Sequence, residues 1–75
     1  MKITIYTKEK IYNFKSIYDK DYNYALKHAH RKDGPAKIWY YNNGNIGYEA
    51  YYINDKYYSE DAFNQILLKR KLQLI

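Results

Sequence analysis

Residues 30–58 of the chain read HRKDGPAKIWYYNNGNIGYEAYYINDKYY, and this stretch decides the fold. Asp33-Gly34-Pro35 predicts a turn, because Asp bonds the backbone ahead of it, Gly allows unusual dihedral angles and Pro interrupts strand pairing. Asn43-Gly44 lies between two aromatic runs and is the strongest short-range signal of a β-hairpin. Strands are therefore expected over residues 36–42 and 45–54.

A two-residue turn at Asn43-Gly44 also predicts the register of this hairpin. One face is expected to pair Tyr41 with Ile46, Trp39 with Tyr48 and Lys37 with Ala50, and the other to pair Tyr40 with Gly47, Ile38 with Glu49 and Ala36 with Tyr51. Both faces are apolar or aromatic, so one of them is left for further strands or for a partner. The set that contains the single tryptophan is taken as the core-facing one: Trp39, Tyr41, Ile46 and Tyr48.

A helix is expected over about residues 59–73, after a turn at Asn54-Asp55-Lys56 that Tyr57-Tyr58 closes. Ser59 is a favoured N-cap, and the acidic residues after it suit the positive end of the helix dipole. The apolar side chains of the helix form a stripe wider than one small sheet covers: Phe63, Ile66, Leu67 and Leu74, extended by Leu68, Leu72 and Ile75. A broad core face and a homodimer contact are the two readings of this stripe.

The N-terminal third is less definite. Residues 2–7 alternate, with Ile3 and Ile5 on one side, which predicts a half-buried strand. Residues 11–18 fit a strand or a helix, and their Tyr, Phe and Ile content favours the strand. Residues 22–29 are read as a third strand, with a short helix as the competing interpretation. Together these elements predict an α+β fold, an antiparallel meander with one C-terminal helix packed on it.

Composition narrows the class of protein. The 75 residues are expected to form a single domain (1–75), β-rich over 1–58. The absence of cysteine excludes a disulfide, a thiolate zinc site and a thiol nucleophile. No apolar run approaches the length of a membrane span or of a signal-peptide core, so no membrane partner and a cytoplasmic location are expected.

Charge and aromatic content point towards binding. The net charge of +5 favours acidic partners, although a Lys-, Asn-, Ile- and Tyr-rich composition also arises in AT-rich genomes without any nucleic-acid function. The chain has twelve tyrosines, two phenylalanines and one tryptophan, more rings than so small a domain can bury. Some of these rings are therefore expected at the surface, where contiguous apolar groups mark contact sites.

The run His30-Arg31-Lys32-Asp33-Gly34-Pro35-Ala36, followed by two aromatic strands around Asn-Gly, resembles a motif of small phage and prophage proteins that are loosely similar to MORN-type repeats. The segment 51–59 resembles the end of such a unit, with Asp55 where glycine is usual. The resemblance covers residues 28–70 in a single copy. It implies hairpin architecture and a phage origin, and small phage proteins are often inhibitors or adaptors, including counter-defence proteins such as anti-CRISPRs.

No constellation of residues predicts catalysis. His28 and His30 share a strand face near Asp33, but no third ligand is well placed, so they are not taken as a metal site. Glu49 is the one carboxylate inside a predicted strand, among aromatic residues. No Ser/His/acid arrangement and no phosphate-binding glycine loop is present. We therefore expect a protein that is not an enzyme and needs no cofactor.

The functional expectation is a phage-type protein that binds and modulates a host protein or protein–nucleic acid complex in the host cytoplasm. The alternative is a basic aromatic module that binds nucleic acid or a nucleotide by stacking and phosphate contacts. Both hypotheses use the same candidate binding residues: His30, Arg31, Lys32, Lys37, Trp39, Tyr41, Tyr48 and Tyr52.

Overall fold

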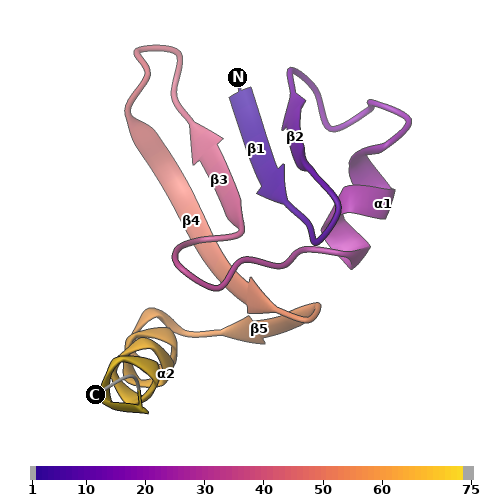
Figure 1. Ribbon diagram of the computed structural model, residues 1–75. Helices are drawn as coiled ribbons and strands as arrows, with labels where there is room; N and C mark the ends of the chain where they lie inside the picture. The colour runs from indigo at the N-terminus through magenta and orange to yellow at the C-terminus, as the bar shows by residue number, and fades with distance from the viewer. Residues whose placement is uncertain (1, 74–75) are drawn as a thin grey trace.

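The computed structural model describes residues 2–73, and the side chains of residues 2–70. Five antiparallel strands and two helices follow one another along the chain: β1 (Lys2–Tyr6), β2 (Ile11–Phe14), α1 (Tyr22–Lys27), β3 (Lys37–Tyr40), β4 (Ile46–Ile53), β5 (Lys56–Tyr58) and α2 (Glu60–Gln73). The strands form one sheet in the order β2-β1-β3-β4-β5. The predicted α+β class is confirmed, but the sheet is not a simple meander, because β1 lies between β2 and β3 (Figure 1).

The main core lies between the sheet and α1. Ile3 and Ile5 are fully buried on one face of β1, as their alternation predicted, and Phe14 of β2 lies beside them. Tyr22 of α1 packs edge-on against Phe14, with ring centroids 5.6 Å apart. Figure 1 shows α1 beside the β1–β2 half of the sheet. We call the sheet face that carries Ile3 and Ile5 the α1 face.

The strand expected over residues 22–29 is wrong, and the competing helix is correct for residues 22–27. Its buried residues are Tyr22 and Ala25, and Ala29 is buried just after it. Tyr22 and Ala25 are three residues apart, which puts both side chains on one side of the helix. Ala29 follows the helix and forms an isolated antiparallel bridge with Thr7.

The β3–β4 hairpin keeps part of the predicted register. The pairs Lys37–Ala50, Ile38–Glu49 and Trp39–Tyr48 are confirmed. Nearer the turn the prediction is wrong, because Tyr40 pairs with Ile46 and the register shifts between Trp39 and Tyr40. Tyr41 is therefore not paired with Ile46, and Gly47 is the extra residue of a β-bulge.

The cause of this shift is a three-residue turn instead of a two-residue turn. The N–H of Gly44 donates to the carbonyl of Tyr41 at 3.0 Å, and the N–H of Tyr41 donates to the carbonyl of Asn45 at 2.8 Å. Gly44 has a φ of +88°, the left-handed conformation that such a loop requires at its third residue. The longer loop moves the register by one residue, and the bulge at Gly47 moves it back.

The β4–β5 hairpin turns at Asn54-Asp55, where both residues have positive φ values of 51° and 70°. This is the geometry of a two-residue type I′ turn, so Asp55 takes the conformation that glycine would adopt more easily. The turn was predicted, but Lys56–Tyr58 is a strand of its own, which pairs with Tyr51–Ile53.

The C-terminal helix begins as predicted. The Ser59 hydroxyl accepts the N–H of Ala62 at 3.2 Å, which caps α2. Phe63 is 1% exposed and packs on Tyr51, with ring centroids 4.6 Å apart. Figure 1 places α2 at the end of the sheet, beside β5, and away from the β1–β2 half. Leu74 and Ile75, two members of the predicted stripe, lie outside the described residues, as does the side chain of Leu72.

Candidate functional site: the aromatic hairpin

The turn end of the β3–β4 hairpin carries aromatic side chains in solvent. Tyr41 is 62% exposed and Tyr48 is 51% exposed, and every residue from 41 to 49 is classed as exposed. Ile46 is also half exposed. The prediction that Tyr41, Ile46 and Tyr48 face the core is therefore wrong. Only Trp39 of that set packs against the buried cluster, because α1 covers the other half of the sheet.

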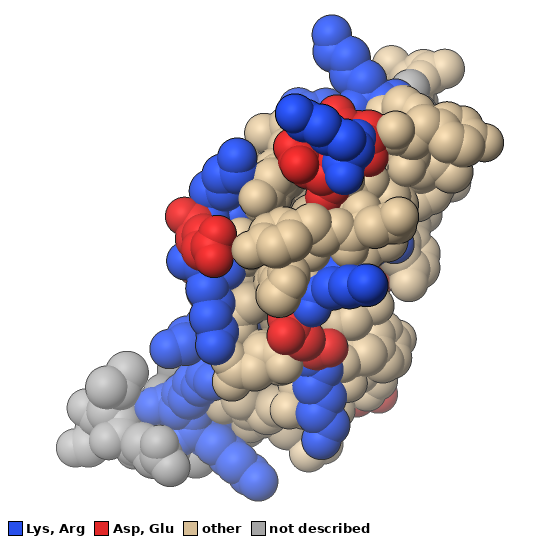
Figure 2. Space-filling view, turned by 90° about the vertical axis from the view of Figure 1, so that its right-hand side faces the viewer, with Lys and Arg blue, Asp and Glu red and all other residues tan. Residues whose placement is uncertain are grey.

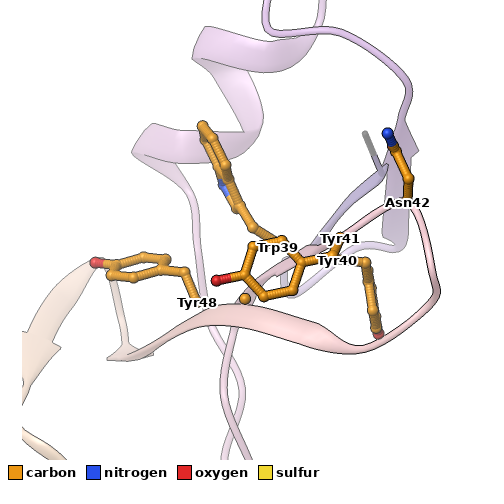
Figure 3. Close-up of a pocket in the computed structure, with 6 residues that line it drawn as sticks. Trp39, Tyr40, Tyr41, Asn42 and Tyr48 are labelled. Carbon is orange, nitrogen blue, oxygen red and sulfur yellow. The ribbon is translucent and has the colours of Figure 1, made fainter.

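A groove crosses this end of the hairpin. It has a volume of about 330 Å³ and is lined by Trp39, Tyr40, Tyr41, Asn42, Gly47 and Tyr48, which we call the hairpin groove. Figure 3 shows Trp39, Tyr41 and Tyr48 around the groove, with Tyr40 pointing to the other side of the strand. The lining is mostly aromatic, as in sites that bind apolar or aromatic groups.

Gly47 positions the ring of Tyr41 in this groove. A Cβ atom at Gly47 would lie 3.0 Å from two ring carbons of Tyr41, closer than normal contact allows. The ring thus lies on the bare backbone of the bulge. The predicted register set Tyr40 opposite Gly47, whereas the ring that lies over Gly47 is that of Tyr41. The bulge, which was not predicted, brings Tyr41 to this position.

Four more of the predicted binding residues share the α1 face with Tyr41: Lys37, Trp39, Tyr48 and Tyr52. The ammonium of Lys37 lies 5.4 Å from the Trp39 ring and 5.9 Å from the Tyr22 ring. Burial lowers the pKa of Lys37 below its usual value. Lys37 is thus placed under aromatic rings, and not at a position where it projects towards a phosphate.

The indole N–H of Trp39 is buried and has no hydrogen-bond partner among the side chains that the structure describes. Tyr52, farther along the same face, contacts Tyr57 with ring centroids 5.7 Å apart. Burial raises the pKa of the Tyr52 hydroxyl, and the neighbouring Tyr48 and Tyr57 add to the rise. Trp39 therefore lines the groove on the side of the core, while Tyr41 and Tyr48 form its accessible rim.

Arg31 lies elsewhere. Its guanidinium stacks on the Tyr6 ring at 4.0 Å, its Nε pairs with Asp33 at 2.9 Å, and it donates to the carbonyl of Pro35 at 3.2 Å. Arg31 also lowers the pKa of the Asp33 carboxyl below its usual value. These contacts fix the loop before β3. Tyr6 alternates with Ile5, so its side chain leaves β1 on the side away from the α1 face, and Arg31 lies there with it. Arg31 is therefore on the opposite side of the sheet from the five predicted residues of the α1 face.

His30 also has a structural role in this loop. Its Nδ1 accepts the N–H of Asn54 at 2.9 Å, and its own N–H donates to the carbonyl of Tyr6 at 2.8 Å. His30 therefore connects β1 to the β4–β5 turn. Within the described part of the chain, no group of three or more His, Asp or Glu side chains is arranged to hold a metal ion.

We expect His30 to make stability depend on pH. Burial lowers the pKa of His30, and the charges of Lys8, Lys32 and Arg70 lower it further. The unfolded chain therefore binds a proton at His30 more readily than the folded chain does. The free energy of unfolding is expected to fall as pH drops below the unfolded-state value of about 6.5, and to level off below the folded-state pKa.

The measurement is urea denaturation of the parent chain and of His30→Gln across about pH 5 to 8, where histidine titrates. The pH dependence should be smaller in His30→Gln. His28→Gln is the matched control, since His28 is exposed and contacts the Tyr24 ring at a tilt, with ring centroids 4.4 Å apart. Equal pH profiles for His30→Gln and the parent chain would show that His30 does not carry the effect.

The positive charge of the chain is dispersed. Figure 2 shows the side of the molecule that carries β2 and α1, with Lys and Arg side chains spread over its length and acidic groups among them. The Lys2 ammonium lies 5.5 Å from the Tyr40 ring centroid and the Lys10 ammonium lies 4.3 Å from the Tyr12 ring centroid, so two lysines of the chain lie over tyrosine rings. Neither contact lies on the accessible rim of the hairpin groove.

A second groove follows the outer edge of β4, the edge that faces away from β3. It has a volume of about 380 Å³ and is lined by Ile46, Gly47, Tyr48, Glu49, Tyr51, Tyr57 and Glu60, which we call the edge groove. Sequence reasoning did not find it, because β5 was not predicted. The signal present in the sequence was Glu49, a carboxylate within an aromatic strand.

Comparison of the chain with protein-family models, with curated proteins and with solved structures gave no match. The resemblance to small phage proteins therefore stays a prediction. No helix of the described residues is long and apolar enough to cross a membrane.

Proposed function

We propose that the protein is a non-catalytic binding protein of the small phage type, which modulates a host macromolecule in the host cytoplasm. The exposed aromatic end of the β3–β4 hairpin carries this proposal. Tyr41 and Tyr48 expose large rings at the rim of the hairpin groove. They lie on paired strands that contain the β-bulge at Gly47. Tyr and Trp supply much of the binding energy at protein interfaces. The resemblance to phage proteins supports the host-directed role, which includes counter-defence.

A host protein is favoured over nucleic acid as the partner. Stacking of bases requires cations beside the rings, to contact the phosphates. Arg31 is held by Asp33 and Pro35, and Lys37 is half-buried under Trp39. The charged groups that line the edge groove next to Tyr48 are carboxylates, Glu49 and Glu60. They repel phosphate, so the aromatic surface suits a protein better than a nucleic-acid backbone.

The test is capture of a partner from bacterial lysate by the full chain, with nuclease and at about 0.5 M salt, where phosphate contacts are strongly weakened. The double variant Tyr41→Ser, Tyr48→Ser should bind the captured protein at least about tenfold more weakly, since aromatic anchors contribute most of the affinity. Tyr18→Ser is the matched control, because Tyr18 is 90% exposed and lies in the β2–α1 connection. It should leave the affinity unchanged.

Two results would contradict the proposal. Equal loss of affinity in Tyr18→Ser would show that the hairpin is not the contact surface. Retention of nucleic acid alone, released by salt, would favour the stacking module instead. Such binding should weaken with salt in proportion to the number of phosphates contacted.

A further inference from the structure

The outer edge of β4 is open over half of the strand. β4 pairs with β3 on one side through Ile46–Ala50, while β5 covers the other side only at Tyr51, Tyr52 and Ile53. Within the part of the chain that the structure describes, no strand pairs with residues 46–50 on the outer side. Figure 1 shows the upper part of β4 at the margin of the sheet. An open edge of this kind is a template for another strand.

The alternation of the backbone shows which groups face outwards. The N–H of Tyr6 donates to the carbonyl of Ala36, so Tyr6 and Ala36 are a hydrogen-bonded pair of the β1–β3 ladder. Hydrogen-bonded pairs alternate along an antiparallel ladder, so the next one is Thr4–Ile38. Lys37 and Trp39 then direct their backbone groups to β4, where Ala50 and Tyr48 are their partners. Glu49, between those two, directs its N–H and C=O away from β3.

Side chains around this open edge form the edge groove. Glu49 accepts a hydrogen bond from the Tyr51 hydroxyl at 3.5 Å. Burial raises the pKa of the Tyr51 hydroxyl, and the carboxylates of Glu60 and Glu49 nearby raise it further. Glu49, Tyr51 and Glu60 line the edge groove together, and the Tyr51 ring leaves β4 on the same face as Glu49. Tyr48 and Tyr57 line the groove from the α1 face. Carboxylates and aromatic faces together are the chemistry that holds a Lys or Arg side chain.

We propose that β4 binds an extended segment of a partner protein by strand addition at Glu49, with a Lys or Arg of that segment in the edge groove. Main-chain hydrogen bonds hold such a segment, and pockets for its side chains select its sequence. This inference rests on the proposed function, because it specifies how the host protein is recognised. A second copy of the chain is a poorer occupant. Two-fold pairing centred on Glu49 would set the two carboxylates directly opposite each other, which is destabilising.

The probes are two blocked six-residue peptides, one of alternating threonine and lysine and one with glutamate in place of lysine. Their binding to the full isotope-labelled chain is followed by NMR. The lysine peptide should shift the amide signals of residues 46–50 and of Tyr57. Its Kd should be at least about tenfold lower than that of the glutamate peptide, because charge complementarity sets the preference.

Two variants of Glu49 distinguish the contribution of its backbone N–H from that of its carboxylate charge. Glu49→Gln keeps the outward N–H and removes the charge, so it should weaken the lysine peptide. Glu49→Pro also removes the N–H, at an edge position where proline is tolerated, and should abolish binding. Glu9→Gln is the matched control, since the Glu9 carboxylate also accepts a tyrosine hydroxyl at 3.5 Å, from Tyr24. It should leave the Kd unchanged.

Amide exchange of the parent chain tests the inference even if Glu49→Pro does not fold. The Glu49 amide should exchange rapidly in the free chain and at least about tenfold more slowly when the lysine peptide is saturating, because a new hydrogen bond protects it. Protection of Glu49 in the free chain, or equal affinity for both peptides, would overturn the inference. If a host protein is captured but Glu49→Gln and Glu49→Pro bind it normally, this inference fails and the proposed function stands. If no protein is captured, the proposed function fails whatever the peptides show.

Discussion

Ile5→Ala is expected to lower the free energy of unfolding by about 3 to 4 kcal/mol, in the middle of the range of about 2 to 5 kcal/mol for truncation of a buried aliphatic side chain to alanine. Ile5 is 0% exposed and lies on β1, between its partners Tyr12 of β2 and Lys37 of β3. Rigid strands on both sides limit how far the site can collapse. A chain of this length has a total stability of roughly 4 to 11 kcal/mol, so this loss is at least about a quarter of the total.

Urea denaturation of Ile5→Ala and Ile11→Ala measures this effect. Ile11 is the matched control, because it is the same residue type in the neighbouring strand β2 and is 53% exposed. Its replacement should cost less than about 1 kcal/mol, since little buried area is lost. Similar losses in the two variants would show that the α1 face of β1 is not the centre of the core.

Much of the fold follows from local patterns in the sequence. The alternation around Ile3 and Ile5 places β1 and its buried face correctly, and the serine at position 59 caps α2 as predicted. Asn43-Gly44 places the β3–β4 hairpin, although not the length of its turn. Each of these features is determined by residues that are close together in the sequence, so it can be predicted from the sequence alone.

The helix α1 could not be distinguished from a strand by its pattern alone. Asp21, the residue before it, makes no side-chain capping hydrogen bond, so the usual start signal is missing. Tyr22, Ala25 and Ala29 fit a helical face, but residues 22–29 also alternate. What decides the outcome is tertiary: the Ile3, Ile5 and Phe14 side chains need a cover, and the helix supplies Tyr22 and Ala25 to that cluster.

The candidate site was predicted in its residue types and not in its arrangement. Trp39 was expected to face the core and packs against it, but Tyr41 and Tyr48 lie beyond the reach of α1 and stay in solvent. Arg31 was assigned to the binding surface because of its charge, and Asp33, two residues later, engages it instead. Burial and ion pairing of a side chain depend on which other elements pack against its strand. The hydrophobic pattern of the hairpin sequence alone does not contain that information.

Phe63→Ala is expected to detach α2 from the sheet. Truncation of a buried phenylalanine costs about 3 to 5 kcal/mol, and Phe63 is the one fully buried side chain among residues 60–70 of α2. The helix has 14 residues, a length at which isolated helices are marginal in water. The α1-side core, in contrast, is a separate cluster to which Phe63 does not belong. We therefore expect the helix to melt while β1, β2 and α1 stay folded.

The outcome is measured by amide exchange and chemical shifts along the chain, with Leu68→Ala as the matched control. Leu68 is 59% exposed on the same helix, so its truncation should leave α2 docked. Detachment also removes Glu60 from the edge groove, because Glu60 is the first residue of α2. Phe63→Ala should then weaken binding of the lysine peptide, while the hairpin groove, which contains no residue of α2, keeps its lining. Cooperative unfolding of the whole chain on this one substitution would instead show that the two ends of the sheet are stabilised as one unit.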